Sequence, residues 1–357
     1  MIRKGLKRFT DGHRNLWRLI IGKPMKPRRL WFEVTDNCNS HCTHCSIWSQ
    51  PNCPKPLNID EIRKIFSDPL LNEVETIINS GGEAILHPQI TEIVKIQHEL
   101  LPKAHLDLST NGLLPDKTIS IVEEILRNGA KTGIKLNVGV SLDGLGDKHD
   151  KIRGVPGNFQ KVDRLLKGLK ELKNKYPKNL SLIIGLTLSE LTVDGWEDVK
   201  KYADNLGIEL MVQWYNQSSF YGNDKDGSSK ELQRKMKDAV SKQVQSTTRE
   251  RWLKLLENKS IKFRCFAANT FFVMKCDGTV VPCLTHWDME IGNARRQSFA
   301  EIWNNPGAAK ARCTAKHCPG CLNSWGLNWS LSDAFWPRLM FFVRHPKEII
   351  KKIKEKK

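Results

Sequence analysis

Short runs of β-branched and apolar residues alternate with longer amphipathic stretches between residues 30 and 215. The short runs predict strands at residues 30–34, 74–78, 105–108, 136–142, 180–188 and 208–213. The amphipathic stretches between them predict helices at 59–66, 90–101, 117–128, 159–176 and 193–206. Strands that alternate with helices in this way form parallel β/α units, here about six. Because a full barrel has about eight units, the pattern predicts an α/β fold whose sheet is open or incompletely closed, with ligands at the carboxyl ends of the strands.

The chain changes character after this region. The polar stretch at residues 218–229 is the strongest boundary signal, and a helical connector is predicted from residue 230 to about 256. From Arg264 onward the pattern changes to short strands, turns and cysteines. We therefore divide the chain into a basic amphipathic segment (1–29), a core (30–215), a linker with a connector helix (216–260), a small cysteine-rich domain (261–325) and a basic aromatic tail (326–357).

The two ends of the chain carry most of its formal charge of +18: residues 1–29 contribute +9 and residues 338–357 contribute +6. Both ends are also rich in Trp, Phe and Leu. Such segments suit an anionic membrane surface, where each Lys or Arg is worth roughly 1 kcal/mol, and packing helices with solvated basic faces are an equal alternative. No nucleic-acid partner is expected, because no recognition motif accompanies the charge. The start of the chain resembles neither a signal peptide nor a transmembrane helix. We expect a cytoplasmic protein. If the basic ends bind a membrane, the protein contacts its inner face peripherally.

Ten cysteines fall into an N-terminal and a C-terminal group, with none between Cys53 and Cys265. Their short spacings, without a secretory signal, favour metal binding in a reducing compartment over disulfides. The segment NCNSHCTHCS places three of them, Cys38, Cys42 and Cys45, in a loop after the first predicted strand.

Three cysteines leave one position of a tetrahedral metal site unfilled. A zinc site would close with a fourth ligand, for which the nearby candidates are His41, His44 and Cys53. An iron–sulfur cluster held by three thiolates instead leaves one iron open to an exogenous ligand. The spacing alone favours neither.

The Cys-x3-Cys-x2-Cys spacing directly after a first strand resembles the radical S-adenosylmethionine (SAM) superfamily. Further motifs similar to those of the family follow at the ends of successive predicted strands, namely SGGEA (80–84), LSTNG (108–112) and VSLDG (140–144) with KIRGVPG (151–157). Each motif is weak alone, and their order along the chain carries the resemblance. It covers roughly residues 30–215 and implies a partial (β/α)6 radical SAM barrel.

The resemblance implies that the three cysteines ligate a [4Fe–4S] cluster whose fourth iron binds the amino and carboxylate groups of SAM. Reductive cleavage of SAM then gives a 5′-deoxyadenosyl radical that abstracts hydrogen from a substrate. A reductant protein of the ferredoxin or flavodoxin type is implied as partner. The implied SAM contacts are Gly81, Gly82, Glu83, Asn111, Ser141, Asp143, Arg153 and His44.

Two positions depart from the family's commonest pattern. His44 stands where an aromatic residue is usual, and Ala84 stands where proline is frequent. An imidazole can still stack beside an adenine, and neither change removes a ligand.

The second cysteine group runs from residue 265 to 283 and from 313 to 321. On spacing, a zinc ribbon is one interpretation. The spacing of Cys265, Gly278 and Cys283, with the segment at 291–305, resembles the auxiliary-cluster domains called SPASM and twitch. That resemblance implies one auxiliary [4Fe–4S] cluster with an electron-transfer or architectural role and leaves Cys276 and Cys313 as extras. Its implied ligands are Cys265, Cys283, Cys318 and Cys321.

These features together predict a radical SAM enzyme whose reaction and catalytic residues are unassigned. An electron acceptor near the substrate suits dehydrogenation or ring-forming coupling. The basic aromatic ends favour a lipid or a lipid-linked glycan as substrate, with a ribosomally made peptide as the alternative. The candidate substrate-facing residues are Gln213, Trp214 and Tyr215. A zinc-stabilised, non-catalytic binding protein is the alternative from another class.

Overall fold

The computed structural model describes residues 24–50, 53, 55–214, 230–243, 253–254, 264–318 and 324–333. Several predicted features lie outside these residues. They are most of the basic segment at the start, most of the second half of the predicted connector helix, the basic tail after residue 333, Tyr215 and Cys321.

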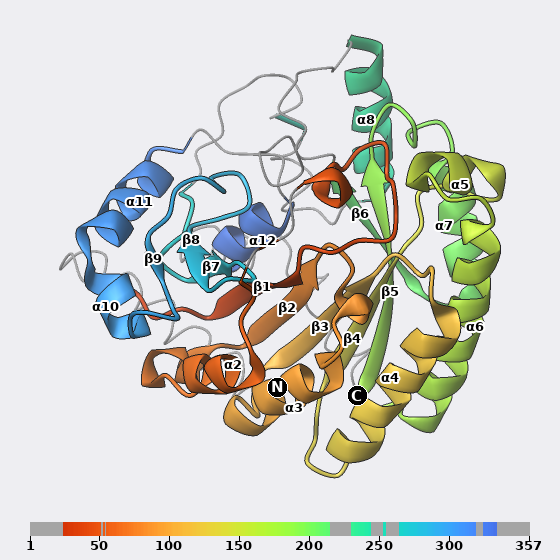
Figure 1. The fold of residues 1–357 in the computed structure, drawn as a ribbon. Helices are drawn as coiled ribbons and strands as arrows, with labels where there is room; N and C mark the ends of the chain where they lie inside the picture. The colour runs from red at the N-terminus through yellow and green to blue at the C-terminus, as the bar shows by residue number, and fades with distance from the viewer. Residues whose placement is uncertain are drawn as a thin grey trace, which may run out of the picture.

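A mostly parallel sheet forms the centre of the molecule (Figure 1). The described strands lie in the order β6-β5-β4-β3-β2-β1-β7-β8-β9, so that β6 and β9 form the two edges. Strands β1 to β6 are parallel, as predicted, and the predicted ranges agree with the observed ones to within three residues at each end. The bounds are Arg29–Thr35 (β1), Thr76–Gly81 (β2), His105–Thr110 (β3), Leu136–Ser141 (β4), Leu180–Leu188 (β5) and Glu209–Trp214 (β6).

Helices cover the outer face of this sheet (Figure 1). Alternate residues of β1, Leu30, Phe32 and Val34, face the helices within one large core. The neighbouring positions, such as Trp31, point to the inner face, where the site lies. The bounds are Ile59–Phe66 (α2), Ile90–Leu100 (α3), Pro115–Gly129 (α4), Asp147–Arg153 (α5), Asn158–Lys175 (α6), Trp196–Leu206 (α7) and Lys230–Gln243 (α8), with short 3₁₀ helices at Ile47–Ser49, Pro69–Glu73 and Ala84–Leu86.

The cysteine-rich region continues the central sheet. Strand β7 (Phe271–Met274) pairs in parallel with β1, and β8 (Thr279–Val281) and β9 (Gly292–Asn293) follow antiparallel. Three helices accompany these strands where the sequence predicted only short strands and turns. They are α10 (Phe299–Asn304), α11 (Pro306–Lys316) and α12 (Ser324–Asp333), and Figure 1 shows α12 beside β7 and β8.

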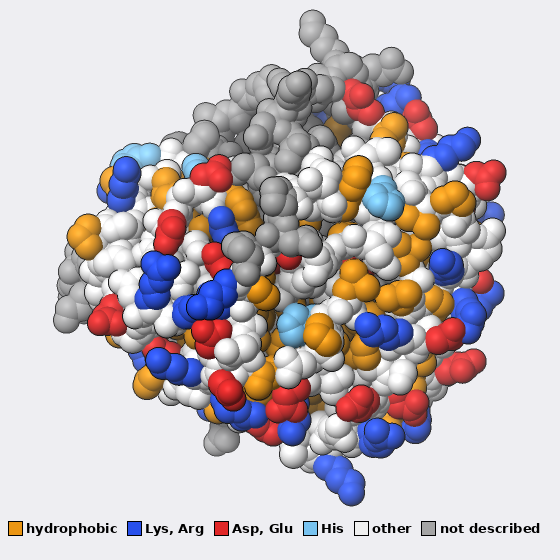
Figure 2. Space-filling view, in the orientation of Figure 1, with side chains coloured by type: hydrophobic (Ala, Val, Ile, Leu, Met, Phe, Trp, Pro, Cys, Tyr) orange, Lys and Arg blue, Asp and Glu red, His pale blue; other side chains and the backbone are white. Residues whose placement is uncertain are grey.

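On the face drawn in Figure 2, Lys and Arg side chains are interspersed with Asp and Glu. Among the described helices, none combines the length and the apolar character that crossing a bilayer requires.

Candidate active site and auxiliary cluster site

The loop with the first three cysteines is held by the end of α5. The backbone N–H groups of His41 and Thr43 donate to the carbonyls of Arg153 and Ile152 at 3.1 and 2.9 Å. The Ser40 hydroxyl donates to the Arg153 carbonyl at 3.0 Å. The Ile-Arg-Gly motif therefore supplies backbone acceptors that fix the cysteine loop, in addition to the Arg153 side chain.

The two glycines of the Gly-Gly-Glu motif lie against the start of the same loop. A Cβ on Gly81 would come 2.2 Å from the Thr35 carbonyl oxygen, and one on Gly82 would come 2.2 Å from that of Asn37. Gly82 and Glu83 donate their N–H groups to these two carbonyls at 2.8 and 2.7 Å. Both positions therefore require glycine, because the carbonyls of Thr35 at the end of β1 and of Asn37 just before the cysteine loop pack directly on them.

A cavity at the carboxyl ends of β1 to β6 brings together the predicted ligands. Of the predicted SAM contacts, Asp143 alone does not line it. The predicted residues in its wall are Cys38, Cys42, Cys45, His44, Gly81, Gly82, Glu83, Asn111, Ser141 and Arg153. Gln213, a candidate substrate-facing residue, also lines the cavity. For Trp214 the structure describes only the backbone.

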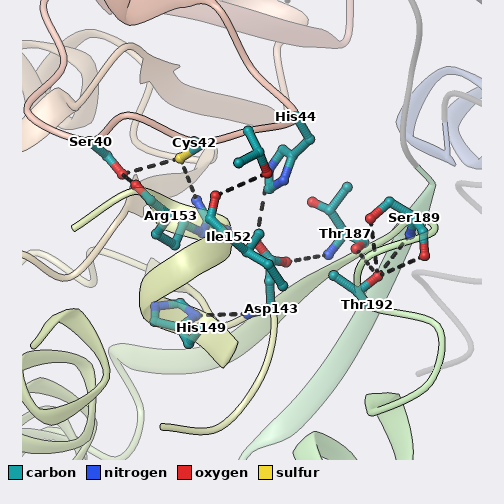
Figure 3. Close-up of polar contacts among 11 residues, drawn as sticks. Ser40, Cys42, His44, Asp143, His149, Ile152, Arg153, Thr187, Ser189 and Thr192 are labelled. Atoms are coloured by element: carbon teal, nitrogen blue, oxygen red, sulfur yellow. Dashed lines mark hydrogen bonds and ion pairs between the residues drawn. The ribbon is translucent and has the colours of Figure 1, made fainter. Parts of the chain in front are cut away.

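Asp143 lies behind the cavity wall and holds two residues that line it (Figure 3). Its carboxylate contacts Arg153 Nη2 at 2.6 Å and His44 Nε2 at 3.8 Å, and it accepts the Thr187 N–H at 2.8 Å. Burial alone raises the pKa of Asp143, but the Arg153 guanidinium and the N–H of Thr187 outweigh it and the pKa is lowered. In this structure Asp143 therefore supports Arg153 and His44, and its own contact with SAM stays a prediction.

Arg153 brings a permanent positive charge to this wall. Its Nη1 lies 3.7 Å from Cys42 Sγ, and its side chain is almost completely buried. Burial lowers the pKa of the guanidinium, but Asp143 and Cys42 more than compensate, so the pKa is raised and Arg153 stays charged. Burial lowers the pKa of His44 to about 4, so its imidazole is neutral near pH 7.

Glu83 provides a buried carboxylate in the wall of the same cavity. It is 2% exposed and accepts the N–H groups of Asn111 at 2.6 Å and Ile85 at 3.2 Å. Burial raises the pKa of Glu83 to about 7. A carboxylate in this setting gains from a cationic partner, and an ammonium group is such a partner. The residues present therefore fit the amino group of SAM.

A second cavity contains three of the four predicted auxiliary ligands, Cys265, Cys283 and Cys318. Its wall is almost entirely apolar. Burial raises the pKa of Cys265 to about 12, and burial also raises the pKa of Cys283, although the N–H groups of His286 and Thr285 oppose it. These two N–H groups favour a thiolate at Cys283, which is the form that binds iron.

Two tryptophans line both cavities. Trp31 of β1 and Trp325 of α12 make an edge-to-face contact, with ring centroids 6.1 Å apart. Trp325 Nε1 donates to Gln213 Oε1 at 3.4 Å, which ties α12 to the end of β6. Neither tryptophan could be recognised as a cavity residue from the sequence, because an indole in a strand or helix is ordinarily a core residue. The one sequence feature that indicates a cavity position for Trp31 is its alternation with Leu30 and Phe32, which places its side chain on the inner face of β1.

The extra cysteines lie away from both cavities. Cys276 is buried next to Glu33, whose carboxylate accepts the Cys276 N–H at 3.2 Å, and the Cys53 thiol is a neighbour of the Cys276 thiol. Cys313 is exposed on α11, with its Sγ 4.0 Å from His317 Nδ1. Within the described residues, no three His, Cys, Asp or Glu side chains lie close enough to ligate a single metal ion. The described cysteines that are predicted cluster ligands instead line the walls of the two cavities, Cys38, Cys42 and Cys45 in the first and Cys265, Cys283 and Cys318 in the second.

Comparison with known proteins agrees with this geometry. The family model of the radical SAM superfamily matches residues 32–203, and that of an iron–sulfur cluster-binding domain, SPASM, matches residues 265–322. Together they cover well over half of the chain. These matches favour the enzyme over the zinc-stabilised binding protein.

Named relatives extend the match. The AdoMet-dependent heme synthase of Methanosarcina barkeri is 25% identical, over 85% of this chain and 93% of its own. The sporulation killing factor maturation protein SkfB of Bacillus subtilis is 24% identical, over 80% of this chain and 67% of its own. The structure of Streptococcus suis SuiB bound to the precursor peptide SuiA superposes with a TM-score of 0.61 at 18% identity, over 84% of this chain and 70% of that one. This last likeness shows that the fold is shared.

The cofactors follow from the two matched domains. They are a [4Fe–4S] cluster that binds SAM, SAM itself and an auxiliary iron–sulfur cluster. The first cavity fits SAM and its cluster, because three cysteines line it together with Glu83 and Arg153. The second cavity fits an auxiliary cluster, because three cysteines line an otherwise mainly apolar wall. The chain therefore belongs to the radical SAM superfamily, as an enzyme with a C-terminal SPASM domain.

Proposed function

We propose that the enzyme catalyses an oxidative radical reaction, a dehydrogenation or a ring-forming coupling, on a substrate bound in the first cavity. The observation that carries this proposal is the shared wall, because Trp31 and Trp325 each line both cavities. When bound, the two clusters and SAM supply a 5′-deoxyadenosyl radical in one cavity and an electron acceptor in the other. The substrate then loses a hydrogen atom to the radical, an electron to the acceptor and a proton to solvent, which together amount to two hydrogen atoms.

The protein residues orient SAM and exclude water. In the proposed arrangement Cys38, Cys42 and Cys45 hold the first cluster, and Cys265, Cys283, Cys318 and Cys321 hold the second. Glu83 receives the amino group of SAM, and Arg153, fixed by Asp143, supplies positive charge for its carboxylate. The remaining SAM contacts are proposed for Gly81, Gly82, Asn111, Ser141 and His44.

For the substrate we propose a lipid or a lipid-linked glycan first. The support is the charge of +9 on residues 1–29 and +6 on residues 338–357, mixed with aromatic residues, which suits peripheral binding to an anionic membrane. A peptide is the second candidate. SkfB is named as a maturation protein of a killing factor and SuiB was solved with a precursor peptide.

The test is an anaerobic assay of the reconstituted enzyme with SAM, a ferredoxin- or flavodoxin-type reductant, and lipid, glycan or peptide fractions. We expect one fraction to raise 5′-deoxyadenosine formation and to yield a product two hydrogen atoms lighter. In Cys283→Ala, SAM cleavage should persist while the oxidised product is lost. An undiminished yield of oxidised product from this variant would refute the oxidative role. Stimulation by the peptide fraction alone would replace the lipid proposal with the peptide one.

A further inference from the structure

The indole N–H of Trp31 is a buried donor at the boundary of the two cavities. Trp31 is 7% exposed, and its Nε1 has no hydrogen-bond partner among the described residues. Buried polar groups are almost always paired, and an orphan donor in a cavity wall indicates an acceptor that binds in that cavity. Trp325 differs in this respect, because its N–H already donates to Gln213.

The surroundings of Trp31 come from both domains and from α12. Its hydrophobic cluster includes Ile47, Ile78 and Cys45 of the radical SAM domain, Val273, Val281 and Leu284 of the SPASM domain, and Trp325 and Trp329 of α12. Val273, Leu284, Trp325 and Trp329 also line the cavity of Cys265, Cys283 and Cys318. The wall of that cavity is almost entirely apolar, whereas the SAM cavity has Ser40, Asn111 and Arg153 as further polar groups.

Thr285 is a second donor in the same cavity. Its hydroxyl is buried without an oxygen or nitrogen partner among the described residues. The hydroxyl lies against the thiol of Cys283, one of the predicted ligands of the auxiliary cluster. Two buried side-chain donors therefore lie in a cavity whose remaining surface is mainly apolar and whose predicted occupant carries negatively charged sulfur.

We propose that the Trp31 N–H and the Thr285 hydroxyl donate hydrogen bonds to the sulfurs of the auxiliary cluster and thereby raise its reduction potential. Hydrogen bonds to the sulfurs stabilise the more negative, reduced state of such a cluster. The cluster becomes a better acceptor for the electron that an oxidative reaction must remove. Trp31 and Thr285 then adjust the reduction potential of the auxiliary cluster. The shift in reduction potential does not depend on the proposed function. Only its use, to accept an electron in an oxidative reaction, rests on that function.

The test is a redox titration of the anaerobically reconstituted enzyme, followed by electron paramagnetic resonance of both clusters. Trp31→Phe keeps the ring and removes the N–H, and Thr285→Val keeps the shape and removes the hydroxyl. We expect each change to shift the midpoint potential of the auxiliary cluster to more negative values, with the SAM cluster unchanged. Thr285→Ser should restore the wild-type potential. Trp325→Phe is the matched control and should leave the auxiliary potential unchanged.

Three results would overturn the inference: no shift in Trp31→Phe and Thr285→Val, an equal shift in Trp325→Phe, or a shift confined to the SAM cluster. Iron analysis of each variant checks that both clusters are present. The proposed function fails separately, if Cys283→Ala still makes oxidised product while the Trp31→Phe shift is observed.

Discussion

At the scale of single residues, the Ile-Arg-Gly motif depends on a glycine that the cysteine loop touches. Gly154 ends α5 with φ of +66°, and a Cβ there would lie 2.4 Å from the His41 carbonyl oxygen. Gly133 has a similar φ of +81° but nothing within 4 Å of a Cβ. Alanine at Gly133 therefore tests backbone strain alone, whereas alanine at Gly154 tests the same strain together with a clash against the cysteine loop.

We predict that Gly133→Ala costs about 1–2 kcal/mol, the ordinary penalty for a left-handed alanine. Gly154→Ala should cost more, and it should also reduce iron bound by the first cluster, because the loop must move away from α5. Thermal unfolding and iron analysis of the two variants measure both effects. Equal losses of stability with full iron content would show that the contact is unimportant.

Motif residues were the part of the site that the sequence could predict. Cys38, Glu83 and Arg153 fall at strand ends or helix ends, where a family resemblance assigns roles directly. The position of Asp143 behind Arg153 could not be predicted, because a motif does not show which side chain faces the cavity. Trp325 could not be predicted either, because its place depends on how α12 docks against β1.

At the scale of elements, periodicity located the six strands and the five long helices between them. It missed the short helix α5, whose seven residues contain too few apolar positions for a repeat. It also missed α10 to α12, where cysteines and turn residues suggested irregular structure. The pairing of β7 with β1 joins residues about 240 apart in sequence, and no local pattern specifies such a contact.

Asp107 of β3 and Asn137 of β4 form a half-buried cross-strand pair. Burial raises the pKa of Asp107 to about 7 from an ordinary value of 3.8. Because the folded state disfavours the charged carboxylate, a penalty grows as the pH rises from about 4 to about 7 and stays constant above. We predict that Asp107→Asn matches wild type at pH 4 and is more stable by about 1–4 kcal/mol at pH 8. Urea unfolding at both pH values tests this, and a pH-independent difference would contradict it.

The helix α12, which carries Trp325, is anchored by a buried ion pair. Asp333 contacts Arg29 Nη1 at 2.5 Å and Arg28 Nη1 at 3.5 Å. Removing one partner of a buried pair typically costs about 3–5 kcal/mol, so we predict a clear fall in melting temperature for Asp333→Asn together with a loss of auxiliary-cluster iron. Asp194→Asn breaks an exposed pair with Lys235 and should cost less than about 1 kcal/mol. Retention of both clusters and of stability in Asp333→Asn would show that α12 is held by other contacts.

At the scale of the whole molecule, the sheet joins the two cluster sites. Strand β1 pairs with β2 on one side and with β7 on the other, so the radical SAM strands and the SPASM strands are one sheet. The residues that separate the two cavities come from this shared strand and from α12. The position of the second site beside the first therefore follows from strand pairing.

One chain should hold two clusters in separate sites, and the first cluster alone should cleave SAM. Iron content and 5′-deoxyadenosine formation, measured anaerobically for two sets of cysteine variants, test it most directly. Cys38→Ala, Cys42→Ala and Cys45→Ala combined should lose about half of the iron and all SAM cleavage. Cys265→Ala with Cys283→Ala should lose the other half and still form 5′-deoxyadenosine. Loss of all iron in the first variant, or continued SAM cleavage by it, would contradict the account.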